Sequence, residues 1–155
     1  MADGEHGRSM IEMLGVLAIV GILSVGGISG FNKAMTKFKI AKLKEQMATI
    51  TMNVVNIFRD RYNYAELGTD PVTGAAMAVR LNLIPREMVR DDGSIMHPFN
   101  GKVYIYAVDY ADKPNSGFAI DFDGLPRAVA VELAINGENE SNASLMNLFV
   151  APLHE

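Results

Sequence analysis

One acidic residue stands at the start of the most apolar stretch of this 155-residue chain. Glu12 precedes Met13–Phe31, nineteen residues without a charge. As a helix, this run would reach about 28 Å, close to the ~30 Å hydrocarbon thickness of a bilayer. A carboxylate beside such a helix is costly to bury unless it is protonated, reaches the membrane surface or finds a positive partner. Charge pairing is therefore the chemistry to expect at Glu12.

A short motif leads into this glutamate. Gly7-Arg8-Ser9-Met10-Ile11-Glu12, followed by the apolar Met13–Leu23, resembles the processing and assembly segment of type IV prepilins. The resemblance implies that a prepilin peptidase cuts after Gly7, and that Arg8 becomes the mature amino terminus and a site for N-methylation. It also implies that Glu12, the fifth mature residue, acts in assembly. Two features depart from the family: Arg8 stands where an apolar residue is usual, and the leader is acidic rather than basic.

Little else in the sequence points to chemistry. The three histidines, His6, His97 and His154, are scattered, and the absence of cysteine excludes disulfides and thiolate metal sites. Asp121-Phe122-Asp123-Gly124 has the start of a calcium loop, but Leu125 and Pro126 follow where a ligand and a glycine are needed. We therefore predict a strand end and turn there, with no metal, no cofactor and no enzymatic activity.

The apolar stretch is also rich in glycine. Gly26 and Gly30 form a small-xxx-small pair, which allows close contact between helices in lipid. The adjacent Gly26-Gly27 pair is the place where a helix would bend or unwind most readily. Gly26, Gly27 and Gly30 are therefore candidates for helix packing or a hinge, although glycine is common in membrane helices for general reasons.

An amphipathic pattern continues the helix from Asn32 to Tyr62, with no glycine or proline to stop it. Its apolar residues recur at spacings of three and four, which predicts one buried stripe. The stripe consists of Ile40, Leu43, Met47, Ile50, Val54 and Ile57. We expect it to pack on the rest of the same chain, since a coiled coil with another chain would leave that part without a core.

Charge is unevenly distributed around this helix. Residues 33–63 carry a net charge of +5 and residues 64–155 a net charge of −7, although the whole chain is only at −4. The lysines that follow the apolar run would lie in the cytoplasm by the positive-inside rule, whereas the prepilin motif places them outside. Lipid head groups or acidic neighbours are the alternative partners of these lysines.

The remaining residues predict short helices and an antiparallel sheet. Helices are expected at 73–81, from Pro85 and at 126–135, and strands at 102–108, 118–122 and 145–150, with a turn over 112–117. This order gives an α+β fold in which a long N-terminal helix packs on a small antiparallel sheet. The stretches 83–89, 99–103, 118–122 and 125–127 resemble the heads of type IVb pilins, particularly the thin-pilus pilins of conjugation systems.

Taken together, the sequence predicts three segments: a leader (1–7), a transmembrane and filament-core helix (8–32), and an amphipathic helix with an α+β head (33–155). The resemblance implies a subunit of a type IV pilus or related pseudopilus, made as an inner-membrane precursor in a bacterium and moved to a surface filament. Its implied partners are copies of itself, the peptidase, an assembly platform with its ATPase, and membrane lipid; nucleic acid stays open. The alternative is a signal-anchored extracytoplasmic binding or enzymatic domain that does not polymerise.

Overall fold

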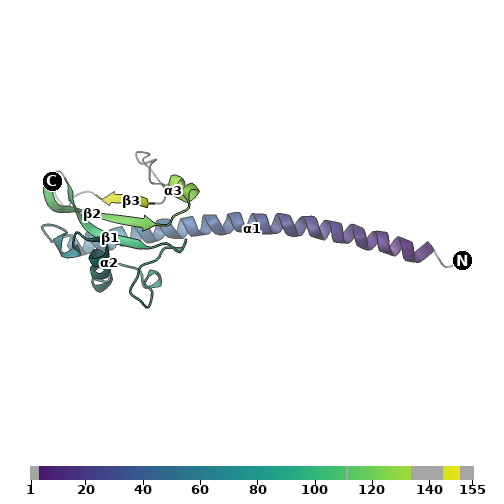
Figure 1. Ribbon diagram of the computed structural model, residues 1–155, viewed down its shortest axis with the longest axis horizontal. Helices are drawn as coiled ribbons and strands as arrows, with labels where there is room; N and C mark the ends of the chain where they lie inside the picture. Colours follow the sequence, from purple (N-terminus) through teal and green to yellow (C-terminus); the bar gives the residue numbers. More distant parts are fainter. Residues whose placement is uncertain (1–3, 111, 134–144, 151–155) are drawn as a thin grey trace. The chain divides into compact units, whose positions relative to one another are not determined.

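The computed structural model describes residues 4–110, 112–133 and 145–150. The chain divides into two units, residues 1–38 and residues 39–155, which are described separately below. Figure 1 shows the elements along the chain, which begins with helix α1 (Gly4–Phe58). The long N-terminal helix and the α+β class predicted from the sequence are confirmed.

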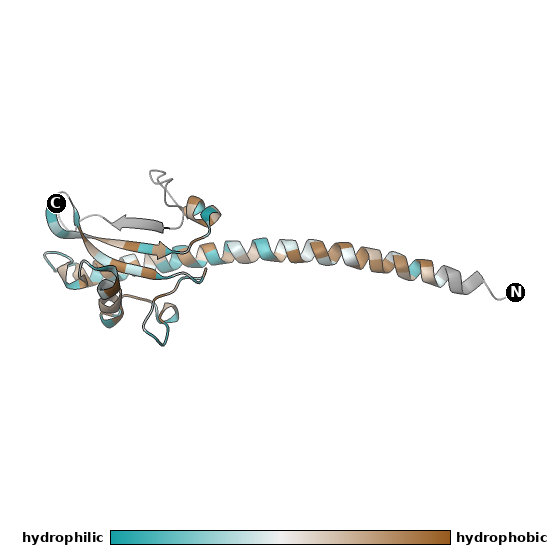
Figure 2. Cartoon of the chain, in the orientation of Figure 1, coloured by the Kyte–Doolittle hydropathy of each residue, from teal (hydrophilic) through white to brown (hydrophobic). Residues whose placement is uncertain are grey.

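The first unit consists of α1 alone. Every side chain from Ser9 to Phe38 is exposed, including the large apolar Leu17 and Ile22. In Figure 2 brown, hydrophobic residues predominate along this part of α1, with white and teal residues among them. By length and composition the helix can cross a membrane. Its backbone stays helical through Gly26 and Gly27, so no unwinding occurs there in the isolated subunit.

The second unit begins with the remaining turns of α1, which carry a buried stripe. The stripe consists of Ile40, Leu43, Met47, Ile50, Val54 and Phe58. The prediction was wrong at its last member, because Ile57 is 41% exposed while Phe58 is fully buried. Phe58 stacks obliquely on Tyr64, with 5.2 Å between ring centroids, and α1 ends there instead of at Tyr62.

The sheet has three antiparallel strands in the order β1-β2-β3. They are β1 (Val103–Tyr110), β2 (Lys113–Asp123) and β3 (Leu145–Val150). Ile105 of β1 lies opposite Ile120 of β2, and both side chains belong to the core cluster that contains the α1 stripe. Because side chains alternate along a strand, one face of β1 and β2 is directed at α1.

Short helices complete the second unit. They are η1 (Ala65–Leu67), α2 (Pro71–Arg80), η2 (Arg86–Met88) and α3 (Arg127–Leu133). The carboxylate of Asp70 caps α2 by accepting from the backbone N–H groups of Val72 and Thr73. Gly74 lets α2 approach β1 closely, since a Cβ atom there would lie 2.1 Å from the carbonyl oxygen of Ile105.

Several predicted boundaries differ from the structure: the helix predicted at 73–81 is 71–80, and the strand predicted at 102–108 is 103–110. The predicted turn over 112–117 is tighter, because β2 already begins at Lys113 and Asp112 adopts a left-handed φ of 60°. The helix predicted over 126–135 is found as α3, and the end of that range lies outside the described residues. The strand predicted at 145–150 is confirmed.

Candidate assembly helix and its head

The predicted processing residues lie at the beginning of α1. The backbones of Gly7 and Arg8 are helical, and Glu12 is exposed one turn beyond Arg8. Glu12 forms no ion pair with any other residue whose side chain the structure describes. The roles predicted for Gly7, Arg8 and Glu12 stay predictions.

The helix around Glu12 is apolar on all sides. Leu14, Leu17 and Ile19 are each at least 60% exposed although they point in different directions around the axis. The hydroxyl of Ser24, within the apolar run, is satisfied locally, since Ser24 Oγ donates to the Val20 carbonyl at 2.7 Å. A helix that is apolar all round is stable only when lipid or protein surrounds it.

The three candidate glycines face open space. A Cβ atom at Gly26, Gly27 or Gly30 would meet no atom within 4 Å. Nothing inside the described subunit therefore requires glycine at these positions. Their predicted role in helix packing or as a hinge stays a prediction.

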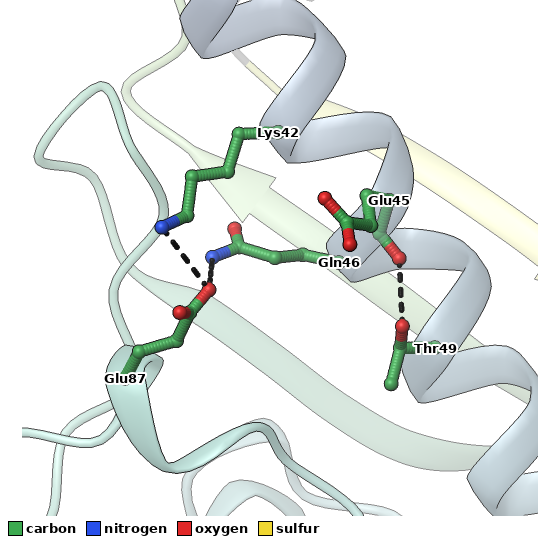
Figure 3. A network of polar contacts seen from close by, with 5 residues as sticks. All are labelled: Lys42, Glu45, Gln46, Thr49 and Glu87. Atoms are coloured by element: carbon green, nitrogen blue, oxygen red, sulfur yellow. Dashed lines mark hydrogen bonds and ion pairs between the residues drawn. The ribbon is translucent and has the colours of Figure 1, made fainter.

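The head, by contrast, fixes its part of α1 through a polar network, shown in Figure 3. Gln46 Nε2 donates to Glu87 Oε1 at 2.8 Å, and Lys42 Nζ lies 3.3 Å from the same oxygen. The Gln46 hydrogen bond and the Lys42 contacts lower the pKa of Glu87. Because Glu87 belongs to η2, the network ties this short helix to α1.

Two further contacts hold the same loop region against α1. Asn53 Nδ2 donates to the carbonyl oxygen of Leu83 at 2.9 Å. Lys39 Nζ lies 5.8 Å from the centre of the Phe99 ring, within the range of a cation–π contact. Lys39 and Lys42, two of the lysines for which the sequence suggested lipid or acidic partners, are thus engaged inside the head.

His97 forms buried contacts with Phe99 and Asp123 that the sequence did not predict. Its side chain is 2% exposed, Nε2 lies 2.8 Å from the carbonyl oxygen of Asp123, and Nδ1 accepts from the Phe99 N–H at 3.2 Å. Nε2 therefore carries the proton and the ring is neutral. Burial lowers the pKa of His97. Gly101 is required beside it, since a Cβ atom there would lie 1.8 Å from the Asp123 carbonyl oxygen.

The Asp121–Gly124 segment is a strand end and turn, as predicted. Tyr106 Oη donates to Asp121 Oδ2 at 2.8 Å, burial raises the pKa of Asp121, and burial and this bond raise the pKa of Tyr106 to about 12. Gly124 turns the chain with a φ of +74°. Among the described residues, no three His, Asp or Glu side chains gather as a metal site would require.

Sequence comparison identifies the class of protein to which this helix and head belong. The profile of the family described as PilS N terminal matches residues 37–148. The chain therefore belongs to this family of type IV pilins. The matched residues belong to the head, and the segment around Gly7 and Glu12 lies outside the match.

One curated relative is a pilin. The chain is 27% identical to the toxin coregulated pilin of Vibrio cholerae over 126 residues, which is 81% of this chain and 54% of the relative. The chain thus spans about half the length of that pilin.

Proposed function

We propose that the chain is a structural, non-enzymatic subunit of a type IV pilus or related pseudopilus, and that it polymerises through the first part of α1. The observation that carries this proposal is the contrast between a head with its own core and a helix whose apolar side chains are all exposed. Lipid can cover that helix in the membrane-inserted precursor, and the helices of other copies can cover it in a filament. Family membership and the similarity to a pilin support the same role.

The proposed processing follows from the order of the residues. Cleavage after Gly7 removes residues 1–7 and leaves the apolar helix in the mature chain. The new amino group at Arg8 is positive, and Glu12 of an adjacent copy can pair with it. Such a pair offsets the cost of an acid in an apolar environment and fixes the stagger between subunits.

The proposed segments follow the sequence prediction, with one point of comparison. The leader is 1–7, the filament-core helix 8–32, and the head with its amphipathic helix 33–155. The compact units divide six residues later, between Phe38 and Lys39, because the buried stripe begins at Ile40. Residues 33–38 are thus an exposed stretch of α1 that follows the apolar run and precedes the buried stripe in the sequence.

The partners proposed are copies of the chain, a prepilin peptidase, an assembly platform with its ATPase, and membrane lipid before assembly. The location proposed is the bacterial inner membrane for the precursor and the cell surface for the filament. The alternative function is a signal-anchored extracytoplasmic domain, which the same exposed helix would also suit.

The mass of the mature chain tests the proposal. We expect residues 8–155, with or without one added methyl group, when the chain is produced with a prepilin peptidase. Gly7→Val should leave the precursor uncut, whereas the matched Gly4→Val should be cut normally. An intact amino terminus in the parent chain, or normal processing of Gly7→Val, would favour the signal-anchored alternative.

A further inference from the structure

Two exposed lysines, Lys33 and Lys37, follow the apolar run. Lys33 and Lys37 stand two and six residues after Phe31, and both side chains are exposed. Neither forms an ion pair with another residue in the described part of the chain. The next two lysines along the helix, by contrast, are engaged inside the head.

The spacing places the ammonium groups of Lys33 and Lys37 on the same side of the helix and close to the same layer of lipid head groups. Residues four apart are neighbours on a helix surface, so Lys33 and Lys37 share a face. Their Cα atoms lie about 3 Å and 9 Å beyond Phe31 along the axis. A head-group layer is roughly 5–7 Å thick on each side of the hydrocarbon core, and a lysine stem can carry its charge toward it. Both groups therefore reach the phosphates of a bilayer that the apolar run spans.

The sign of the local charge identifies the ligand. No acidic residue occurs between Glu12 and Glu45, so the charges at this end of the run are all positive. We infer that Lys33 and Lys37 form a binding site for the phosphate groups of anionic phospholipids. This inference rests on the proposed membrane-inserted precursor. The site holds the head at the membrane surface until assembly removes the subunit from lipid.

Amine labelling of the full chain in vesicles tests this site directly. The chain is reconstituted in phosphatidylcholine alone and in phosphatidylcholine with phosphatidylglycerol, treated with a water-soluble amine-reactive ester, and mapped by mass spectrometry. We expect labelling of Lys33 and Lys37 to fall about fivefold in the anionic vesicles. High salt should restore it. Lys44, an exposed lysine of the head, is the internal control and should not change.

The outcomes separate the lipid site from the proposed function. Equal labelling of Lys33 and Lys37 in the two vesicles, in a chain that resists carbonate extraction, would overturn the lipid site and leave the membrane-inserted precursor intact. Protection that depends on protein concentration and not on lipid charge would assign the lysines to a second copy, which also overturns it. A chain that fails to insert would contradict the precursor itself.

A matched pair of variants provides an independent measurement. The chain is dissolved from mixed vesicles in mild detergent, and the lipid that remains bound is quantified. The parent and K44Q should retain phosphatidylglycerol in severalfold excess over its share in the bulk, given about fivefold per lysine. The double variant K33Q/K37Q should retain it in proportion to the bulk, although it still inserts through its unchanged apolar run. Equal enrichment in all three chains would overturn the inference.

Discussion

Leu17 and Leu43 lie on the same helix and have opposite surroundings. Leu17 is 63% exposed in the subunit, whereas Leu43 is completely buried beneath the sheet of the head. The difference shows which apolar side chains a single copy of the chain can bury by itself. The head covers its own apolar residues, and the first unit of α1 depends on lipid or on other copies to cover them.

The largest effect expected from this comparison concerns the two leucines themselves. Leu43→Ala should lower the free energy of unfolding of the head by about 3 kcal/mol, because it leaves a cavity in a closed core. Leu17→Ala should change it by less than about 0.5 kcal/mol, since its side chain contacts no core. All five tyrosines lie in the head, so urea denaturation in detergent followed by tyrosine fluorescence measures this unit. Similar losses for both variants would contradict the division into two units.

Two glycines, one in the head and one in the exposed part of α1, allow the same comparison. Gly101→Ala should destabilise the head by about 2–3 kcal/mol, because the new methyl group overlaps the Asp123 carbonyl oxygen. Gly26→Ala meets open space and should leave the stability of the head unchanged. If the predicted packing role of Gly26 is correct, that variant should instead reduce filament yield. If Gly101→Ala leaves the head as stable as the parent, the backbone around Gly101 and Asp123 can shift to accommodate the methyl group.

A smaller effect is expected at the start of α2. Asp70→Ala removes the carboxylate that caps two backbone N–H groups, and should lower the thermal midpoint of the head. Asp70→Asn keeps an accepting oxygen and should restore most of the loss. Thermal unfolding by circular dichroism can compare the three chains, and an Asn variant as unstable as the Ala variant would rule out capping as the cause.

A further effect concerns pH, and it belongs to the head alone. Burial lowers the pKa of His97 in the folded head, whereas an unfolded chain has a histidine pKa of about 6.5. Below that pH the unfolded state binds the proton first, so stability falls by at most about 1.4 kcal/mol per pH unit until the folded ring also titrates. Protonation would also set an Nδ1–H against the Phe99 N–H.

The control for this pH effect is His97→Gln, which should be less stable than the parent at neutral pH but lose less as the pH falls. The comparison between the two chains cancels the contribution of Asp121, whose raised pKa acts in both. Urea titrations at several pH values below neutrality measure both slopes. Identical slopes would show that His97 does not titrate during unfolding.

Much of the fold could be predicted from local pattern, and the exceptions have physical reasons. Spacings of three and four identified five of the six buried residues of the stripe. The sixth, Phe58, packs against Tyr64, six residues later, and Tyr64 in turn packs against the distant Phe118, with 5.1 Å between their ring centroids. His97 was missed because its partner Asp123 is 26 residues distant.

The candidate assembly residues depend on a different kind of information. Gly7, Arg8 and Glu12 were found by motif and spacing, and the partners predicted for them are a peptidase and a neighbouring copy of the chain. The exposed helix explains why these residues need partners. It does not by itself distinguish lipid from another copy, which is why the decisive experiment must count filaments.

The most direct test of the account is the yield of sheared surface filaments from Glu12→Val, with Glu45→Val as its control. Glu45 is also an exposed acid on α1, but it belongs to the head. Glu12→Val should insert and be cleaved after Gly7, yet yield at least about tenfold fewer filaments, because the pair with the neighbouring amino terminus is lost. Glu45→Val should assemble like the parent. Equal filament yield from Glu12→Val and the parent would contradict assembly through Glu12 and the exposed helix.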